Sequence, residues 1–123
     1  MKIIYTEKGA APKAPYSQGI ISENFIFTAG QVAIMPGSGE SVGDTVAIQA
    51  EQVCKNIAAI LEAADSSLDK VVKTTCFLTD MATFSEFNAI YEKYFPHRPA
   101  RSCVAVKELP LGYLCEIEVI AEL

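Results

Sequence analysis

The amino-acid sequence predicts a single α+β domain in which two helices pack on one face of a mixed β-sheet. Segments 44–64 and 83–95 carry apolar residues at helical spacing, and six further segments have the alternating or β-branched composition of strands. The predicted element order is strands, helix, strand, helix and two strands. Because the chain has 123 residues and no linker-like tract, residues 1–123 are expected to form one domain.

The first predicted helix covers residues 44–64. Its apolar positions alternate spacings of three and four residues, which places them on one helix face: Ala47, Ala50, Cys54, Ile57 and Leu61. Asp44 is the expected N-cap, because its carboxylate can accept hydrogen bonds from the free amides of the first turn. The residues expected on the solvent side are Gln49, Glu51, Gln52 and Lys55.

The second helix is expected to begin at Thr83. Residues 83–86 fit a capping box, in which threonine and glutamate each satisfy a free backbone amide. The apolar stripe of this helix is predicted to contain Phe84, Phe87, Tyr91 and either Tyr94 or Phe95. Pro96 and Pro99 are expected to end the helix.

The predicted strands are residues 3–6, 19–22, 25–29, 71–78, 102–106 and 114–122. Glu23 and Asn24 form a plausible two-residue hairpin turn. Some strands are apolar on both faces, as in Ile20-Ile21, whereas an antiparallel sheet with one wet face alternates. An exposed second face would leave an apolar patch larger than monomers tolerate. We therefore expect sister subunits to cover the open face of the sheet.

Composition narrows the class of protein. Hydrophobic residues make up 50% of the chain, and 15 acidic residues outnumber 10 basic ones. Nucleic-acid binding is not expected, because it needs a basic surface that displaces counterions from phosphates. No apolar run reaches the roughly 18–20 residues of a membrane span. Residues 1–7 turn polar before a signal peptide could form, so we predict a cytoplasmic protein without membrane contact.

The four cysteines, Cys54, Cys76, Cys103 and Cys115, have no CxxC spacing. Buried reduced thiols are the favoured interpretation. With His97 as the one histidine, no metal site is predicted. A nucleophilic Cys103 is rejected, because no nearby histidine is available to activate it.

Arg101 is the first candidate for chemistry. It follows two prolines in the segment 98–103 and stands at the start of a predicted strand. Its planar fork of donors can bind a carboxylate, and the backbone amides that follow can add hydrogen bonds. Spacing alone leaves open a surface arginine paired with one of the acidic residues.

Six short motifs occur in a characteristic order: APYSQG at 14–19, TAGQ at 28–31, VKTT at 72–75, FNAIY at 87–91, PARSCV at 99–104 and EIE at 116–118. With these motifs the chain resembles the RidA/YjgF family along nearly its full length. The resemblance implies a chorismate-mutase-like fold and a homotrimer with sites in the clefts between subunits. It also implies hydrolysis of reactive 2-imino acids, such as 2-iminobutanoate and 2-iminopropanoate, to 2-oxo acids and ammonia, without metal or organic cofactor.

The resemblance assigns roles to two charged residues. Arg101 matches the arginine that binds the substrate carboxylate. Glu116 matches the glutamate that positions water and can act as general base. The alternative for Glu116 is a solvated strand carboxylate, because Glu118 shares its face of the strand.

Four further residues complete the predicted site. Cys103 contributes backbone contacts to the substrate. Tyr16 lies in a loop that closes the cleft from a neighbouring subunit, where it either binds substrate or packs. Asn88 is a cleft residue of the family or, alternatively, makes a structural hydrogen bond from helix to loop. Gly30 allows close approach of a ligand or forms a plain β-bulge.

The resemblance has one departure, because family deaminases commonly carry serine where this chain has Ala29. Altered rate or preference is expected from this change. The competing hypothesis is a non-enzymatic trimer that binds small carboxylates, which needs Arg101 and not Glu116. An RNA-directed role is disfavoured, because no basic strip with interleaved aromatic residues occurs.

Overall fold

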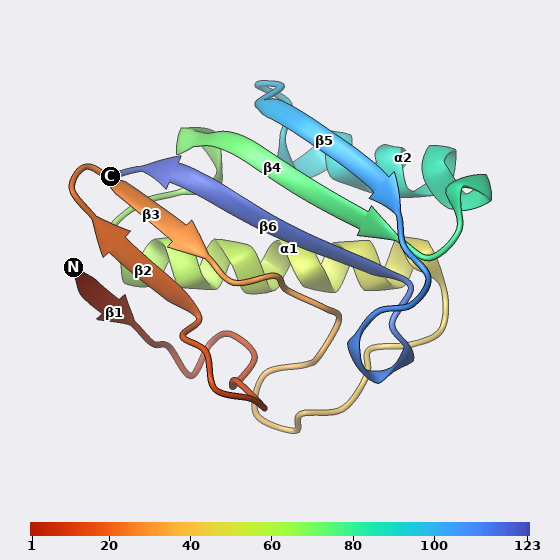
Figure 1. Ribbon diagram of the computed structural model, residues 1–123, viewed down its shortest axis with the longest axis horizontal. Coiled ribbons are helices and arrows are strands. Elements are labelled where there is room, and N and C mark those ends of the chain that lie inside the picture. Colours follow the sequence, from red (N-terminus) through yellow and green to blue (C-terminus); the bar gives the residue numbers. More distant parts are fainter.

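The computed structural model describes all 123 residues and shows one six-stranded sheet with both helices on the same face (Figure 1). The strands are β1 (Lys2–Ile4), β2 (Gly19–Ser22), β3 (Phe25–Thr28), β4 (Val71–Leu78), β5 (Ala100–Ala105) and β6 (Cys115–Glu122). The helices are α1 (Val46–Ala63) and α2 (Phe84–Tyr94). The predicted fold class and element order are confirmed.

The strand order is β1-β2-β3-β6-β4-β5, with β4 and β5 parallel and the other neighbours antiparallel. The sheet is therefore mixed, as predicted. Ser22 pairs with Phe25 across the predicted hairpin turn, in which Glu23 has a φ of 55°. The C-terminal strand β6 lies inside the sheet, between β3 and β4, and β5 forms an edge.

The core lies between the helices and the inward face of the sheet. Alternate residues of β6 are buried there. Cys54, Cys76 and Cys115 are buried free thiols, as predicted, whereas Cys103 is a free thiol that is only partly buried. The outward face carries apolar side chains in solvent, with Phe27 43% and Val104 46% exposed. The sheet is thus apolar on both faces.

The start of α1 differs from the prediction. Thr45 is the N-cap in place of Asp44, and its Oγ1 accepts a hydrogen bond from the Ile48 amide at 3.2 Å. Gln49 is buried, not solvent-facing. Its Nε2 donates to the Gly43 carbonyl and its Oε1 accepts from the Leu114 amide, both at 2.8 Å, so both polar ends of the amide are satisfied inside the protein.

The predicted capping box of α2 is wrong. Thr83 makes no side-chain cap, because its Oγ1 donates to the Asp80 carbonyl at 2.7 Å. A short 3₁₀ turn, Met81–Thr83, precedes the helix, and the Asp80 side chain accepts from the Ala82 amide. The apolar stripe is confirmed, with Phe87, Tyr91 and Phe95 buried.

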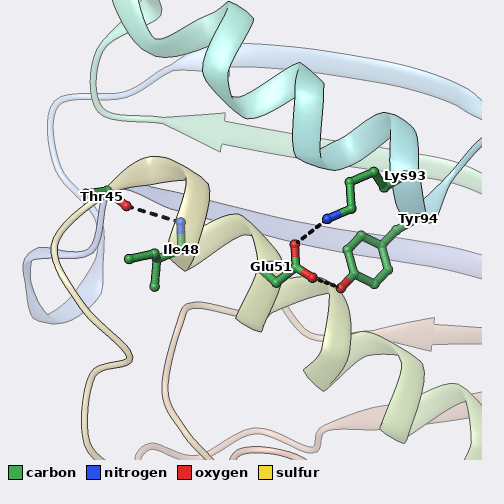
Figure 2. A network of polar contacts seen from close by, with 5 residues as sticks. All are labelled: Thr45, Ile48, Glu51, Lys93 and Tyr94. Atoms are coloured by element: carbon green, nitrogen blue, oxygen red, sulfur yellow. Dashed lines mark hydrogen bonds and ion pairs between the residues drawn. The ribbon is translucent and has the colours of Figure 1, made fainter.

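Polar contacts join the two helices. Glu51 on α1 accepts hydrogen bonds from Lys93 and Tyr94 of α2 (Figure 2). The Lys93–Glu51 pair is exposed, and such pairs contribute at most about 1 kcal/mol. The buried aromatic residues Phe87, Tyr91 and Phe95 pack in the hydrophobic core. Neither helix is long and apolar enough to cross a bilayer.

Candidate functional site

Five of the six predicted site residues divide between two cavities of the chain, and Cys103 lines neither. The Glu116 cavity, of about 380 Å³, is lined by Glu116, Tyr16, Gly30 and seven further residues. The Arg101 cavity, of about 360 Å³, is lined by Arg101, Asn88 and five others. No residue lines both cavities.

Strand register explains this separation. Arg101 of β5 pairs with Thr74 of β4, and Glu116 of β6 pairs with Phe77 of the same strand. Side chains alternate between faces along a strand, so positions 74 and 77 point to opposite faces. Thr74 is buried under the helices. Arg101 therefore lies on the helix face of the sheet, whereas Glu116 lies on the open face.

The Arg101 guanidinium is held in place by residues of α2. Its Nη1 donates to Asn88 Oδ1 at 2.8 Å. Its Cζ lies 4.6 Å from the ring centroid of Tyr91 and 5.5 Å from that of Phe84, within the range of cation–π attraction. Arg101 forms no ion pair, so the alternative of a surface arginine paired with an acid is wrong.

Asn88 makes a helix-to-strand contact, whereas the structural alternative predicted a contact from helix to loop. Its carbonyl oxygen occupies one of the guanidinium donors, and Arg101 has five such N–H groups. None of the donors is paired with a carboxylate of the chain. The asparagine orients the arginine without neutralising it.

Glu116 is a half-buried carboxyl group. Burial raises its pKa above the ordinary value of 4.5, and the negative charge of Glu118 adds to this rise. A Cβ atom on Gly30 would stand 2.8 Å from Glu116 Cδ and 2.9 Å from Oε1, inside van der Waals contact. Gly30 thus leaves the space that the carboxyl group occupies, a role that neither sequence interpretation contained.

The segment that carries Gly30 is tied to β6 and α1. Gln31 and Ile117 exchange backbone hydrogen bonds of 2.8 and 3.1 Å. The buried Asn56 side chain donates to the carbonyls of Ile34, at 2.8 Å, and Val32, at 3.4 Å. These bonds fix Gly30 against Glu116.

The rest of the Glu116 cavity is mostly apolar. Ala29 lines it, together with Val32, Ile34, Pro110 and Leu111. Lys13 also lines it and donates to the Gly39 carbonyl at 2.9 Å. Sequence reasoning missed Lys13 and Leu111. For Leu111 the available sequence signal was its place between Pro110 and Gly112, a turn-forming pair of residues before β6.

Cys103 and Tyr16 lie on separate sides of the protein. Cys103 lies on β5 opposite Cys76, and burial raises the pKa of its thiol, so the uncharged form predominates at neutral pH. His97 Nε2 lies 3.0 Å from the Val71 carbonyl. A thiol nucleophile is not supported. Tyr16 is exposed at the rim of the Glu116 cavity, available to a ligand or a partner.

Comparison with known proteins places the chain in a family. The family model described as Endoribonuclease L-PSP matches residues 6–123. AldR of Lactococcus lactis, named as a candidate regulator, is 52% identical and covers 99% of this chain and 98% of its own. Reactive Intermediate Deaminase A, chloroplastic, of Arabidopsis thaliana is 45% identical over 99% of this chain and 66% of its own.

A solved structure of Escherichia coli TdcF with bound serine superposes with a TM-score of 0.95. It is 36% identical and covers 100% of this chain and 99% of its own. The fold, the motifs and the full-length identities agree. The chain therefore belongs to the RidA/YjgF family, whose family model is described as Endoribonuclease L-PSP.

Proposed function

We propose that the protein hydrolyses reactive 2-imino acids, such as 2-iminobutanoate and 2-iminopropanoate, to 2-oxo acids and ammonia. The observation that carries this proposal is a restrained arginine without an acidic partner, combined with a half-buried glutamate of raised pKa. A relative named Reactive Intermediate Deaminase A supports it. Water is the nucleophile and no redox change occurs, so the reaction requires no cofactor.

The proposed site forms between two copies of the chain. Arg101 and Glu116 lie on opposite faces of one sheet, so Arg101 of one copy has to meet the Glu116 cavity of another. Three copies in a closed ring would repeat this contact three times. The same association would cover the exposed apolar side chains Phe27 and Val104.

Binding begins at the carboxylate of the imino acid. Arg101 offers its remaining N–H groups in a planar fork that matches two carboxylate oxygens. β5 is an edge strand, so its outer row of backbone N–H groups has no strand partner. Cys103, on this strand, is the residue to which the resemblance assigns backbone contacts.

Glu116 then acts on water. Its carboxylate takes a proton from the water as the oxygen bonds to C2, and passes that proton to the imine nitrogen. The carbinolamine that forms loses its hydroxyl proton through the same carboxyl group to nitrogen. The C–N bond breaks, leaving the 2-oxo acid and ammonia. A raised pKa suits this shuttling, because a base works best with a pKa near the operating pH.

The second candidate is a carboxylate-binding regulator without turnover. The serine bound to TdcF and the name of AldR favour it. It would use Arg101 and leave Glu116 without a chemical role. RNA cleavage, which the family model's description names, has less support here, because the net charge is −5 and the one histidine bonds to a backbone carbonyl.

The test is the decay of 2-iminobutanoate generated in place by a threonine dehydratase, followed as 2-oxobutanoate formation. Wild type should accelerate the decay, and Arg101→Ala should lose about 30-fold or more, the cost of removing one partner of a buried charge pair. Glu116→Ala should lose the acceleration as well. Matched controls are Lys107→Ala, an exposed cation that follows β5, and Glu122→Ala, an exposed glutamate of β6. No acceleration over buffer would contradict the enzyme and favour the regulator.

A further inference from the structure

We infer that Tyr91 and Thr74 are positioning residues for the Arg101 anchor. The Tyr91 ring, locked by Thr74, holds the guanidinium in the orientation that presents its free N–H groups to a carboxylate. The inference rests on the proposed function in one respect, that Arg101 is the group that binds the ligand. The sequence pattern predicts Tyr91 as part of an apolar stripe and assigns no role to Thr74.

The contacts restrain the guanidinium on two sides. Its Cζ lies over the Tyr91 ring, 4.6 Å from the ring centroid. Asn88 accepts from one edge of the group at 2.8 Å. Because the Tyr91 ring and the Asn88 oxygen both contact the guanidinium, its remaining N–H donors point in a defined direction. An arginine side chain free in solvent would have to lose its rotamer freedom when the ligand binds.

The ring is itself immobilised. The Tyr91 hydroxyl and Thr74 Oγ1 share a buried hydrogen bond of 2.7 Å. Thr74 is 0% exposed, and it is also the residue of β4 that pairs with Arg101. Phe95 packs against Tyr91 with 4.6 Å between centroids. One position on β4 therefore fixes both the backbone of Arg101 and the ring under its side chain.

Packing alone does not explain the hydrogen bond between the Tyr91 hydroxyl and Thr74 Oγ1. A phenol on the buried face of α2 and a hydroxyl in the middle of a buried strand each need a partner, and a Phe–Val pair would pack there without that requirement. The hydroxyl pair fixes the tilt of the ring, and the ring faces the guanidinium. The arrangement is suited to orienting Arg101, because Tyr91 lines the same cavity as Arg101.

The experiment measures binding of 2-oxobutanoate, the reaction product, by calorimetry on the assembled protein. Tyr91→Leu removes the ring and should weaken binding about tenfold, the scale of a partly desolvated cation–π contact. Tyr91→Phe keeps the ring and should restore binding to within about threefold of wild type. Tyr94→Leu, an aromatic residue of the same helix that bonds to Glu51 of α1, is the matched control and should bind as wild type.

Two further readouts separate positioning from a merely structural role. The Arg101 Nε–H resonance should show the ring-current shift of a guanidinium over an aromatic ring in wild type, and the shift should become smaller in Tyr91→Leu, which retains only the Phe84 ring at 5.5 Å. Thr74→Val should weaken 2-oxobutanoate binding by the same factor as Tyr91→Phe, because each substitution removes the same hydrogen bond. The double variant should therefore bind no more weakly than either single variant.

Unchanged 2-oxobutanoate binding in folded Tyr91→Leu would overturn the inference, as would equal weakening in Tyr94→Leu or no binding to wild type. Failure of the proposed hydrolysis is a separate result. A wild type that binds 2-oxobutanoate through Arg101 and does not accelerate imine decay would contradict the deaminase and leave the positioning role intact.

Discussion

Arg101 and Glu116 point to opposite faces of the same sheet, although each belongs to a strand that pairs directly with β4. Their partners, Thr74 and Phe77, are three positions apart on that strand, and an odd separation reverses the face. One chain therefore presents half of the proposed site on each side. This relationship makes association between copies part of the proposed chemistry, in addition to covering apolar surface.

Gly30→Ala should displace the Glu116 carboxyl group. The added Cβ would stand 2.8 Å from Cδ, and the carboxyl group has to move. Misplacing a catalytic group by about 1 Å costs on the order of 100-fold in rate. Imine hydrolysis should fall by that amount. Gly9→Ala is the matched control, because its new Cβ would meet no atom closer than 3.5 Å. Equal activity in the two variants would contradict this role of Gly30.

The raised pKa of Glu116 predicts the pH dependence of activity. The base has to be ionised, so kcat/KM should rise with pH through an apparent pKa above 4.5. Glu118→Gln removes the charge that adds to the rise, and should move this apparent pKa down. A pH–rate profile of the two proteins tests this. An unchanged midpoint would show that Glu118 does not act on Glu116.

The same shift predicts an effect on stability. Burial disfavours the ionised form, so the folded state holds its proton to higher pH than the unfolded state does. The free energy of unfolding therefore falls as the pH rises from the pKa of Glu116 in the unfolded chain to its higher pKa in the folded protein. Glu116→Gln removes the titrating group, and with it this pH-dependent loss of stability. Its melting temperature should exceed that of wild type at pH 7, and the difference should shrink below about pH 4, near the unfolded pKa.

Ala29→Ser should change activity only modestly. Ala29 lines the same cavity as Glu116, and serine would add a hydroxyl near the proposed water. Because Arg101 and Glu116 are retained, the rate should stay within about tenfold of wild type, or ~1.4 kcal/mol of barrier. Steady-state kinetics on 2-iminobutanoate measures this. A much larger change would make position 29 central to the mechanism.

Much of the fold could be predicted from periodicity, because burial on one face leaves a repeating signal in the sequence. Strands β2 and β4 match their predicted bounds. Helix starts were less predictable. Asp44 and Thr45 are both good caps, and Thr83 has a capping-box sequence, yet its hydroxyl bonds to the Asp80 carbonyl. The choice depends on the path of the preceding loop, which no local pattern encodes.

The sequence predicts which residues form the candidate site, but it does not predict on which face of the sheet each one lies. Motifs identified Arg101 and Glu116, whereas their faces depend on the register of β4 with two strands distant in sequence. Gln49 was assigned to solvent because its spacing is that of a polar face. Its burial follows from bonds to Gly43 and Leu114, which only tertiary contact supplies.

The most direct test of the shared site mixes two inactive variants. Arg101→Ala retains a working Glu116, and Glu116→Gln retains a working Arg101. After unfolding and refolding together in equal amounts, random association in a ring should restore both groups at about a quarter of the interfaces. The account predicts that imine hydrolysis returns to about this fraction of wild type. Activity no greater than the sum of the separately refolded variants would contradict a site built from two copies.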